Sequence, residues 1–400
     1  MTNTRTLRNS HSRKALRALE IAKAAQKYTI MASPPTITKG TNGANSTVVT
    51  DATQYAPTYL PDNAAFTPLA CSIPVGVSGN YGPTFITETN ASRSQGWGIG
   101  FWTDAEAIDV LFRDNANSKF RVRVDGQWAT AGDSDTSASG ANFVYNKIDF
   151  GTGNGVPRWI ELFFSVSVQV RGICAGFSAG STAANNKFKV WLGADTSPMR
   201  WMFYGDSYIY GTGPTTNVVR NGLVYTCGEY MGIANPIGSG AGGQGYLSAS
   251  NGSALTARGR IADVSTFGAL DVMVVSFGIN DYNQPAATLQ AEVTTTIAEI
   301  MLAQPDALIF GTFFSASAKT VGSTQAAAIK AGFLAAYDSN RMAFLDGSTF
   351  TGNSRQDTSG GNSTIYQNAD NVHPNDLGHV YLGRHLAGEI QAALVTIAAL

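Results

Sequence analysis

Hydrophobic and polar residues alternate along most of the chain between residues 65 and 196. Residues 120–126 alternate strictly and end in an Asp-Gly pair, residues 160–170 carry an apolar side chain at every second position, and residues 188–192 repeat the pattern. A period of two is typical of strands that bury one face, and Asp-Gly is typical of the turn between two strands. We therefore predict an antiparallel β-sandwich, jelly-roll-like, over residues 65–196, with one long strand at 160–170.

A different pattern begins near Arg200, where apolar runs alternate with segments of helical period. Strands separated by helices form a parallel sheet that is covered by helices on both faces. The pattern therefore predicts a three-layer α/β/α domain over residues 197–400, with functional groups at the carboxyl ends of the strands. The predicted strands are 201–204, 270–277, 307–314 and 342–345, and the predicted helices are 217–231, 286–302, 323–337 and 376–394.

Residues 1–30 are strongly basic and differ from the rest of the chain. They hold seven Lys and Arg residues against a single acidic residue, a net charge of +6 in a chain whose total is −1. Good helix formers surround Leu16 and Leu19, and the segment has no unbroken apolar core like that of a secretory signal peptide. The segment is predicted either as a solvated tail or weak surface helix, or as an anchor helix that uses its Leu16–Leu19 face to join a larger assembly. Residues 31–64, rich in Thr, Ser, Asn, Gly and Pro, are predicted as a linker or extended lead-in.

The composition limits the classes of partner. A net charge of −1 gives no electrostatic case for nucleic acid binding, and no apolar run approaches the roughly 18 residues of a membrane span. Low charge with abundant small polar residues fits an extracellular or virion-associated protein. The three cysteines, Cys71, Cys174 and Cys227, have no metal-like spacing. Either Cys71 and Cys174 form a bridge, or all three are buried free thiols.

Three short segments in the second half of the chain carry candidate chemistry. They are Gly205-Asp206-Ser207, the Gly-Ile-Asn-Asp run that holds Asn280, and the Asp-Asn-Val-His run from Asp370 to His373. Serine is a poor nucleophile unless a base takes its proton, and the base needs an acid to orient it. One Asp-x-x-His loop can supply both the base and the acid, and an asparagine amide can donate to an oxyanion.

Simpler structural roles compete with this interpretation. Ser207 can be a helix N-cap, and Asp370 can be a turn residue. Asp206 and Asp281 are predicted to hold their loops by accepting backbone hydrogen bonds, and Asp376 is predicted to cap the last helix. The two histidines that follow His373 come at intervals of six residues, so the three cannot share one helix face and make a poor metal site.

In this order the three motifs resemble those of the SGNH (GDSL-type) hydrolase family, over about half of the chain. The resemblance implies that Ser207 is the nucleophile, His373 the general base and Asp370 the orienting acid. It also implies an oxyanion hole made by the backbone N–H groups of Ser207 and Gly243 and by the amide of Asn280, with no metal or organic cofactor.

The choice of Gly243 rests on a glycine-rich stretch at residues 238–246. This stretch resembles the Gly-Gly-x-Gly-Tyr form of some family members, with Gly242 as the alternative donor. It is not a dinucleotide fingerprint, because the strand, helix and downstream acid that such a site requires are poorly placed.

The family resemblance leaves the substrate open among lipids, thioesters, aryl esters and acetylated carbohydrates. A β-sandwich before the hydrolase domain is similar to that of some carbohydrate esterases, which favours O-acetyl groups of a polysaccharide as substrate and carbohydrate binding by residues 65–196. The basic N-terminal segment and its lead-in suggest a bacteriophage tail or virion protein. The alternatives are a glycan receptor with an inactive hydrolase fold, and a lipase or thioesterase of the same family.

Overall fold

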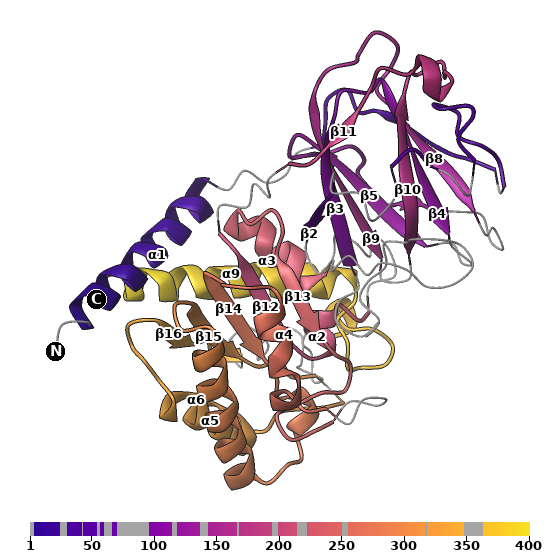
Figure 1. The fold of residues 1–400 in the computed structure, drawn as a ribbon. Helices are drawn as coiled ribbons and strands as arrows, with labels where there is room; N and C mark the ends of the chain where they lie inside the picture. The colour runs from indigo at the N-terminus through magenta and orange to yellow at the C-terminus, as the bar shows by residue number, and fades with distance from the viewer. Residues whose placement is uncertain are drawn as a thin grey trace.

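The computed structural model describes most of the chain, and Figure 1 shows its two regions, a group of antiparallel strands and a parallel sheet surrounded by helices. The described residues are 4–24, 30–41, 43–53, 57–59, 66–69, 96–113, 118–136, 143–165, 168–193, 199–213, 222–249, 255–316, 318–347 and 363–400.

Two antiparallel sheets make up the N-terminal region. One has the strand order β1-β8-β4-β10, and the other the order β11-β3-β9-β5-β6, with β2 paired to β3 and β7 to β5. Apolar side chains of both sheets meet in one core, among them Ile99 of β3 and Val110 of β4. The predicted antiparallel strands are thus confirmed. Their bounds are β1 (Thr36–Lys39), β2 (Thr67–Leu69), β3 (Gly96–Thr103), β4 (Ala107–Arg113), β5 (Lys119–Val124), β6 (Gln127–Trp128), β7 (Ser134–Asp135), β8 (Val144–Asp149), β9 (Arg158–Ser165), β10 (Gln169–Gly176) and β11 (Val190–Trp191), with a 3₁₀ helix η1 (Ala183–Asn185).

The Asp-Gly pair makes the predicted hairpin turn. Asp125 and Gly126 connect β5 to β6 and both have positive φ, 49° and 81°. Positive φ at both central residues is the geometry of the two-residue turns whose twist matches that of paired strands.

The single long strand predicted over residues 160–170 is wrong. β9 ends at Ser165, β10 begins at Gln169, and the two strands belong to different sheets. Leu162 of β9 and Val170 of β10 nevertheless point into the same core. Because both sheets face that core, the apolar alternation continues across the connection and conceals the break in the sequence.

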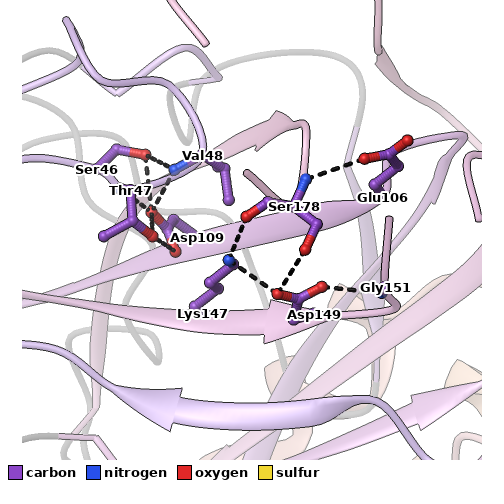
Figure 2. Close-up of polar contacts among 9 residues, drawn as sticks. All are labelled: Ser46, Thr47, Val48, Glu106, Asp109, Lys147, Asp149, Gly151 and Ser178. Atoms are coloured by element: carbon purple, nitrogen blue, oxygen red, sulfur yellow. Dashed lines mark hydrogen bonds and ion pairs between the residues drawn. The ribbon is translucent and has the colours of Figure 1, made fainter. Parts of the chain in front are cut away.

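Part of the predicted linker at residues 31–64 belongs to the β region instead. β1 pairs with β8, and Asp109 of β4 fixes the chain that follows β1. The Asp109 carboxylate accepts hydrogen bonds from Ser46 Oγ at 2.8 Å and from the backbone N–H groups of Thr47 at 2.6 Å and Val48 at 3.2 Å (Figure 2). The polar residues of this segment therefore hydrogen-bond to the sheet. A free linker has the same polar composition, so composition alone does not distinguish the two.

The C-terminal region is the predicted three-layer α/β/α fold. Its five parallel strands have the order β13-β12-β14-β15-β16. Alternate residues of β12 face opposite sides: Phe203 packs among residues of α1, α3 and α9, whereas Met202 packs among residues of α4, α5 and α6. The bounds are β12 (Trp201–Gly205), α2 (Ser207–Tyr210), α3 (Leu223–Met231), β13 (Ile237–Gly240), η2 (Arg258–Arg260), α4 (Ile261–Thr266), β14 (Val272–Ser276), η3 (Ile279–Asp281), α5 (Ala286–Ala303), β15 (Leu308–Thr312), α6 (Ser323–Ala335), β16 (Met342–Phe344), α8 (Ser363–Tyr366) and α9 (Asp376–Ala398).

The sequence pattern misses one strand of this sheet. β13 has the sequence Ile-Gly-Ser-Gly and overlaps the start of the glycine-rich stretch at residues 238–246, where the pattern predicts no strand. It pairs with β12 through backbone groups alone, so it needs none of the branched side chains that usually indicate a strand. Of the helix predicted at 217–231, only the part from Gly222 lies within the described residues, and α3 begins there at Leu223.

The basic N-terminal segment is a packed helix of the C-terminal region. α1 (Thr4–Ala24) packs against α9 near the end of the chain (Figure 1). Ala15 and Leu19 are buried in the same core as Ile397 of α9, while Leu16 is 48% exposed. The predicted solvated tail is therefore wrong. Of the two leucines of the predicted anchor face, Leu19 is covered by the core shared with the chain's own last helix, and Leu16 is not. A short helix that is marginal alone becomes stable when it buries an apolar face in this way.

The two regions contact each other through aromatic and charged side chains. The ring of Tyr225 on α3 meets Phe163 of β9 edge-on, with centroids 6.2 Å apart. Arg123 of β5 forms a buried two-point ion pair with Glu161 at 2.5 and 2.6 Å and donates to Asn235 Oδ1 at 3.3 Å. The paired charges satisfy each other, which reduces the cost of burying them between the regions.

Two further sequence expectations concern membranes and cysteines. No helix in the described part of the chain is long and apolar enough to span a bilayer. Cys174 and Cys227 are buried free thiols, and burial raises the pKa of both. Cys71 lies outside the described residues.

Candidate active site

Ser207 lies where β12 passes into α2. Asp206 caps this short helix, because its Oδ1 accepts a hydrogen bond from the Tyr208 backbone N–H at 2.9 Å. The end of β13 approaches the same turn so closely that a Cβ on Gly240 would lie 2.0 Å from the Tyr210 backbone nitrogen. Only glycine allows that approach, and it brings the loop after β13 next to Ser207.

His373 bridges Ser207 and Asp370. Its Nε2 lies 3.0 Å from Ser207 Oγ, and its Nδ1 lies 2.6 Å from Asp370 Oδ2. An ionised carboxylate can only accept hydrogen bonds, so Nδ1 carries the proton, and the lone pair of Nε2 faces the serine hydroxyl. This is the arrangement in which an imidazole can take a proton from serine. The structure thus brings Ser207 together with two residues that follow it by more than 160 positions in the sequence.

The histidine loop is held in place by its own aspartate. Asp370 Oδ1 accepts hydrogen bonds from the backbone N–H groups of Val372 and His373, each at 2.9 Å. Asn371 adopts a left-handed φ of 55°, which asparagine tolerates better than most residues and which closes the turn. Burial raises the pKa of Asp370, but the hydrogen bonds from His373 and Val372 lower it by more, so its pKa lies below its usual value. The carboxylate therefore stays ionised.

Tyr208 connects the serine turn to the histidine loop. Its hydroxyl donates to the Val372 carbonyl at 2.7 Å, and its buried ring stacks on Phe314 with centroids 5.1 Å apart. No motif in the sequence assigns this role to Tyr208. A tyrosine directly after the candidate nucleophile is a signal for such a contact only once the fold is known.

Asn280 lies in the 3₁₀ helix η3, directly after β14. Its Nδ2 donates to the Gln244 carbonyl at 2.8 Å, and its Oδ1 accepts from Lys319 Nζ at 2.9 Å. Gly243, the residue before Gln244, has a φ of 75° and is partly exposed, in the loop that follows β13. That loop is joined to the serine turn by the Ala241 backbone N–H, which donates to the Gly205 carbonyl at 3.0 Å.

Arg260 supports the loop that carries Gly243. Its buried guanidinium donates to the Ser239 carbonyl at 3.0 Å, to Asp263 Oδ2 at 3.0 Å and to the side-chain oxygen of Gln244. Sequence reasoning gave no role to Arg260 or Gln244, because no motif marks them. Their function follows only from where the chain brings them.

Asp206 and Asp281 have the structural roles predicted for them. Asp281 accepts hydrogen bonds from the backbone N–H groups of Tyr246, Leu247 and Ser248. Burial raises the pKa of Asp281, and burial raises that of Asp206 to about 7. Asp206 Oδ2 is buried and has no hydrogen-bond partner among the described residues, which is consistent with the reluctance of this carboxyl to ionise.

The remaining candidates near the site are structural. His379 is buried, its Nδ1 accepts from the Leu223 backbone N–H at 3.2 Å, and its Nε2 donates to the Thr212 carbonyl at 2.9 Å. Asn375 caps α9 by accepting from the Gly378 backbone N–H at 2.9 Å, so the prediction of Asp376 as the cap is wrong by one residue. Within the part of the chain that the structure describes, no three His, Cys, Asp or Glu side chains gather as a metal site would require.

A protein-family model covers most of the C-terminal region. Residues 203–381, which include every candidate triad residue, match the GDSL-like Lipase/Acylhydrolase family. The C-terminal region is an SGNH-type (GDSL-like) esterase domain. The predicted family is thus confirmed. No curated protein matches the sequence.

Solved structures resemble the esterase domain together with the β region. A family two carbohydrate esterase from Clostridium thermocellum, in complex with cellohexaose, matches with a TM-score of 0.57 and 16% identity over 83% of this chain and 99% of that one. The acetyl xylan esterase Est2A from Butyrivibrio proteoclasticus matches with a TM-score of 0.55 and 10% identity over 84% and 97%. The salicylyl-acyltransferase SsfX3 of a tetracycline biosynthetic pathway matches with a TM-score of 0.61 and 15% identity over 83% and 97%. At these identities the matches establish the shared fold.

Proposed function

We propose that this esterase removes O-acetyl groups from a polysaccharide by means of Ser207, His373 and Asp370. The observation that carries the proposal is the pair of contacts made by one imidazole, 3.0 Å to the serine hydroxyl and 2.6 Å to the aspartate. A serine, a base and an orienting acid in this geometry support nucleophilic attack on a carbonyl carbon.

The reaction begins when Ser207 Oγ attacks the ester carbonyl and its proton moves to His373 Nε2. Asp370 accepts the Nδ1 proton of the imidazole, which keeps the ring oriented and stabilises the imidazolium as it forms. The bond from the carbonyl carbon to the sugar oxygen then breaks, and His373 gives its proton to that oxygen, which leaves as the free sugar hydroxyl and leaves Ser207 acetylated. A water molecule, deprotonated by the same histidine, attacks the acetyl-serine and releases acetate.

The developing oxyanion would be bound by donors on the opposite side of the carbonyl. The candidates are the backbone N–H groups of Ser207 and Gly243 and the second N–H of the Asn280 amide. Asn280 suits this role because Gln244 uses only one of its two amide protons. Each such donor typically contributes about 3 kcal/mol to the stabilisation of the transition state.

The solved structures that resemble both regions of this chain support a carbohydrate as the substrate. Two of the three structures named above are esterases, one a family two carbohydrate esterase and the other an acetyl xylan esterase. The β region also exposes an aromatic surface: Trp191 is 37% exposed and stacks on Trp102, with centroids 6.5 Å and planes 11° apart. The C–H face of a sugar ring packs well on such a flat ring. We therefore assign glycan binding to the β region.

The cellular location stays a prediction, extracellular or virion-associated. Nothing in the fold or in the matches named above supports the virion part of it, since the predicted anchor helix packs on its own chain.

The experiment is a comparison of wild-type protein with Ser207→Ala. The wild type should hydrolyse p-nitrophenyl acetate and release acetate from acetylated xylan or a related acetylated glycan, and Ser207→Ala should do neither. Faster hydrolysis of long-chain than of acetyl esters would indicate a lipase, and an ester formed with an added alcohol in place of free acetate would indicate acyl transfer. Glycan binding without turnover by the wild type would indicate a receptor and overturn the proposal.

A further inference from the structure

Lys319 lies in the loop after β15 and makes a contact that the proposed triad does not require. Its ammonium group donates to Asn280 Oδ1 at 2.9 Å. The side chain is half-buried, and that of Asn280 is 9% exposed. No motif in the sequence singles out Lys319.

The two partners of Asn280 determine which way its amide points. An ammonium group has only hydrogen-bond donors, so it must face the amide oxygen. The Gln244 carbonyl, 2.8 Å from Nδ2, can only accept, so it must face the amide nitrogen. A flipped amide would oppose donor to donor and acceptor to acceptor. The remaining N–H of Asn280 is therefore available to an oxyanion in one defined orientation.

The loop that carries Lys319 is itself held rigidly. Ala316 and Lys319 exchange two backbone hydrogen bonds, at 3.1 and 3.2 Å. The Ala318 backbone N–H donates to the Asn371 carbonyl at 3.0 Å, within the loop that carries His373. Lys319 thus connects the proposed oxyanion donor to the segment that holds the base.

The charge of Lys319 also acts on the amide. A positive charge at the oxygen of an amide draws electron density from its nitrogen, which makes the remaining N–H a stronger donor. The site is partly shielded from water, so this electrostatic effect is larger than it would be in solution. The nearby carboxyls of Asp206 and Asp281 are buried, and Lys319 acts on Asp206 in the sense that favours its ionised form.

We propose that Lys319 is a positioning residue of the esterase, which holds the Asn280 amide with its free N–H toward the oxyanion and strengthens that donor. The inference rests on the proposed function. It does not place Lys319 in contact with substrate: its effect passes through Asn280.

The test is a kinetic comparison on p-nitrophenyl acetate of wild type, Lys319→Met, Lys319→Arg and Asn280→Ala, with Lys330→Met as matched control. Lys330 is a half-exposed lysine of α6 that lies 3.9 Å from Asp346. Removing an oxyanion donor costs about 100- to 1,000-fold in kcat, so removing its support should cost about 10- to 100-fold. We expect that loss in kcat for Lys319→Met, with KM changed less than about twofold. Lys319→Arg, which again offers only donors, should restore most of the activity, and Lys330→Met should match wild type.

A double variant separates a positioning role from a merely structural one. Once Asn280 is alanine there is no amide to orient, so adding Lys319→Met to Asn280→Ala should cause little further loss. The inference would be overturned if the kcat losses of the two single variants multiplied in the double variant. It would equally be overturned if Lys319→Met left kcat unchanged, or if it raised KM alone. Thermal unfolding of every variant corrects for misfolded protein, and Lys319→Arg gives the answer if Lys319→Met does not fold.

A readout without substrate keeps this inference distinct from the proposed function. If wild type has no esterase activity, the proposed function fails, and Lys319 is then tested by hydrogen exchange of the Asn280 side-chain amide by NMR. Faster exchange in Lys319→Met than in Lys330→Met is expected, and equal exchange would overturn the orienting role.

Discussion

Both regions of the molecule contain an aspartate that binds a serine-bearing segment, yet only one of the two can support chemistry. In the β region Asp109 accepts directly from Ser46 Oγ and from backbone N–H groups, and it is 1% exposed (Figure 2). In the esterase domain an imidazole stands between Asp370 and Ser207, and 47% of the Asp370 side chain is exposed.

The difference shows what turns a serine and an aspartate into a catalytic pair. A hydroxyl that donates directly to a buried carboxylate is held as a structural link. A hydroxyl that faces the lone pair of an imidazole can lose its proton, because the histidine can hold that proton and pass it on. The pair of Asp109 and Ser46 has no base between the two groups and is closed to substrate.

The sharpest way to break this comparison is to remove each serine in turn. Ser207→Ala should lower esterase turnover by several orders of magnitude, because a nucleophile cannot be replaced, and should leave the melting temperature within a few degrees. Ser46→Ala should keep wild-type turnover and lose about 1–2 kcal/mol of unfolding free energy, since Asp109 loses a donor and two backbone groups lose an acceptor. Normal turnover in purified Ser207→Ala would refute the mechanism.

Substitutions of the two aspartates should also differ, at Asp370 in turnover and at Asp109 in stability. His373→Ala should lower esterase turnover nearly as much as Ser207→Ala does. Asp370→Asn should retain roughly 10- to 100-fold more turnover than His373→Ala, because orienting the imidazole is only part of the catalytic effect. Asp109→Asn should instead destabilise the protein by about 2–4 kcal/mol with normal turnover per folded molecule. Steady-state kinetics with denaturant unfolding measures both effects, and a turnover defect in Asp109→Asn would undo the distinction.

The N-terminal helix offers a test of which region it belongs to. Deleting residues 1–24 removes Ala15, Ala18 and Leu19 from the core shared with α9, so the melting temperature of the esterase domain should fall by at least about 5 °C. Turnover below that temperature should persist, because α1 packs on α9, α3 and β15 and supplies none of the proposed triad residues. Calorimetry measures the shift, and an unchanged transition would mean that the packing of α1 contributes nothing to stability.

The smallest expected effect concerns Asp206 and pH. Burial raises the pKa of this carboxyl to about 7, so the folded protein holds a proton that the unfolded chain releases near the usual carboxyl pKa. Stability from this group is therefore complete in acid and is lost as the pH rises through about 7. Asp206→Asn removes that loss, so its melting temperature relative to wild type should increase between pH 5 and pH 8. A difference that is independent of pH would show that the carboxyl is ionised throughout.

Much of this molecule could be predicted from short-range pattern. The strands β14, β15 and β16 and the helices α5, α6 and α9 lie within a few residues of their predicted bounds, because each has a regular apolar pattern bounded by polar residues. The triad candidates could be named because Ser207, Asp370 and His373 stand in short motifs whose chemistry requires those residue types. The strand β13 could not be predicted, since a glycine-rich strand has no apolar periodicity of its own.

The fold class of the C-terminal region and the three candidate residues Ser207, His373 and Asp370 could be named from local sequence patterns. Tertiary structure alone decided what surrounds them: that Lys319 and Gln244 orient Asn280, that Tyr208 holds the histidine loop, and that α1 belongs to the domain at the other end of the chain. The physical reason is range. Periodicity and motifs record interactions between neighbours in sequence, whereas these contacts join segments separated by tens to hundreds of residues, and any polar or small residue could have made them.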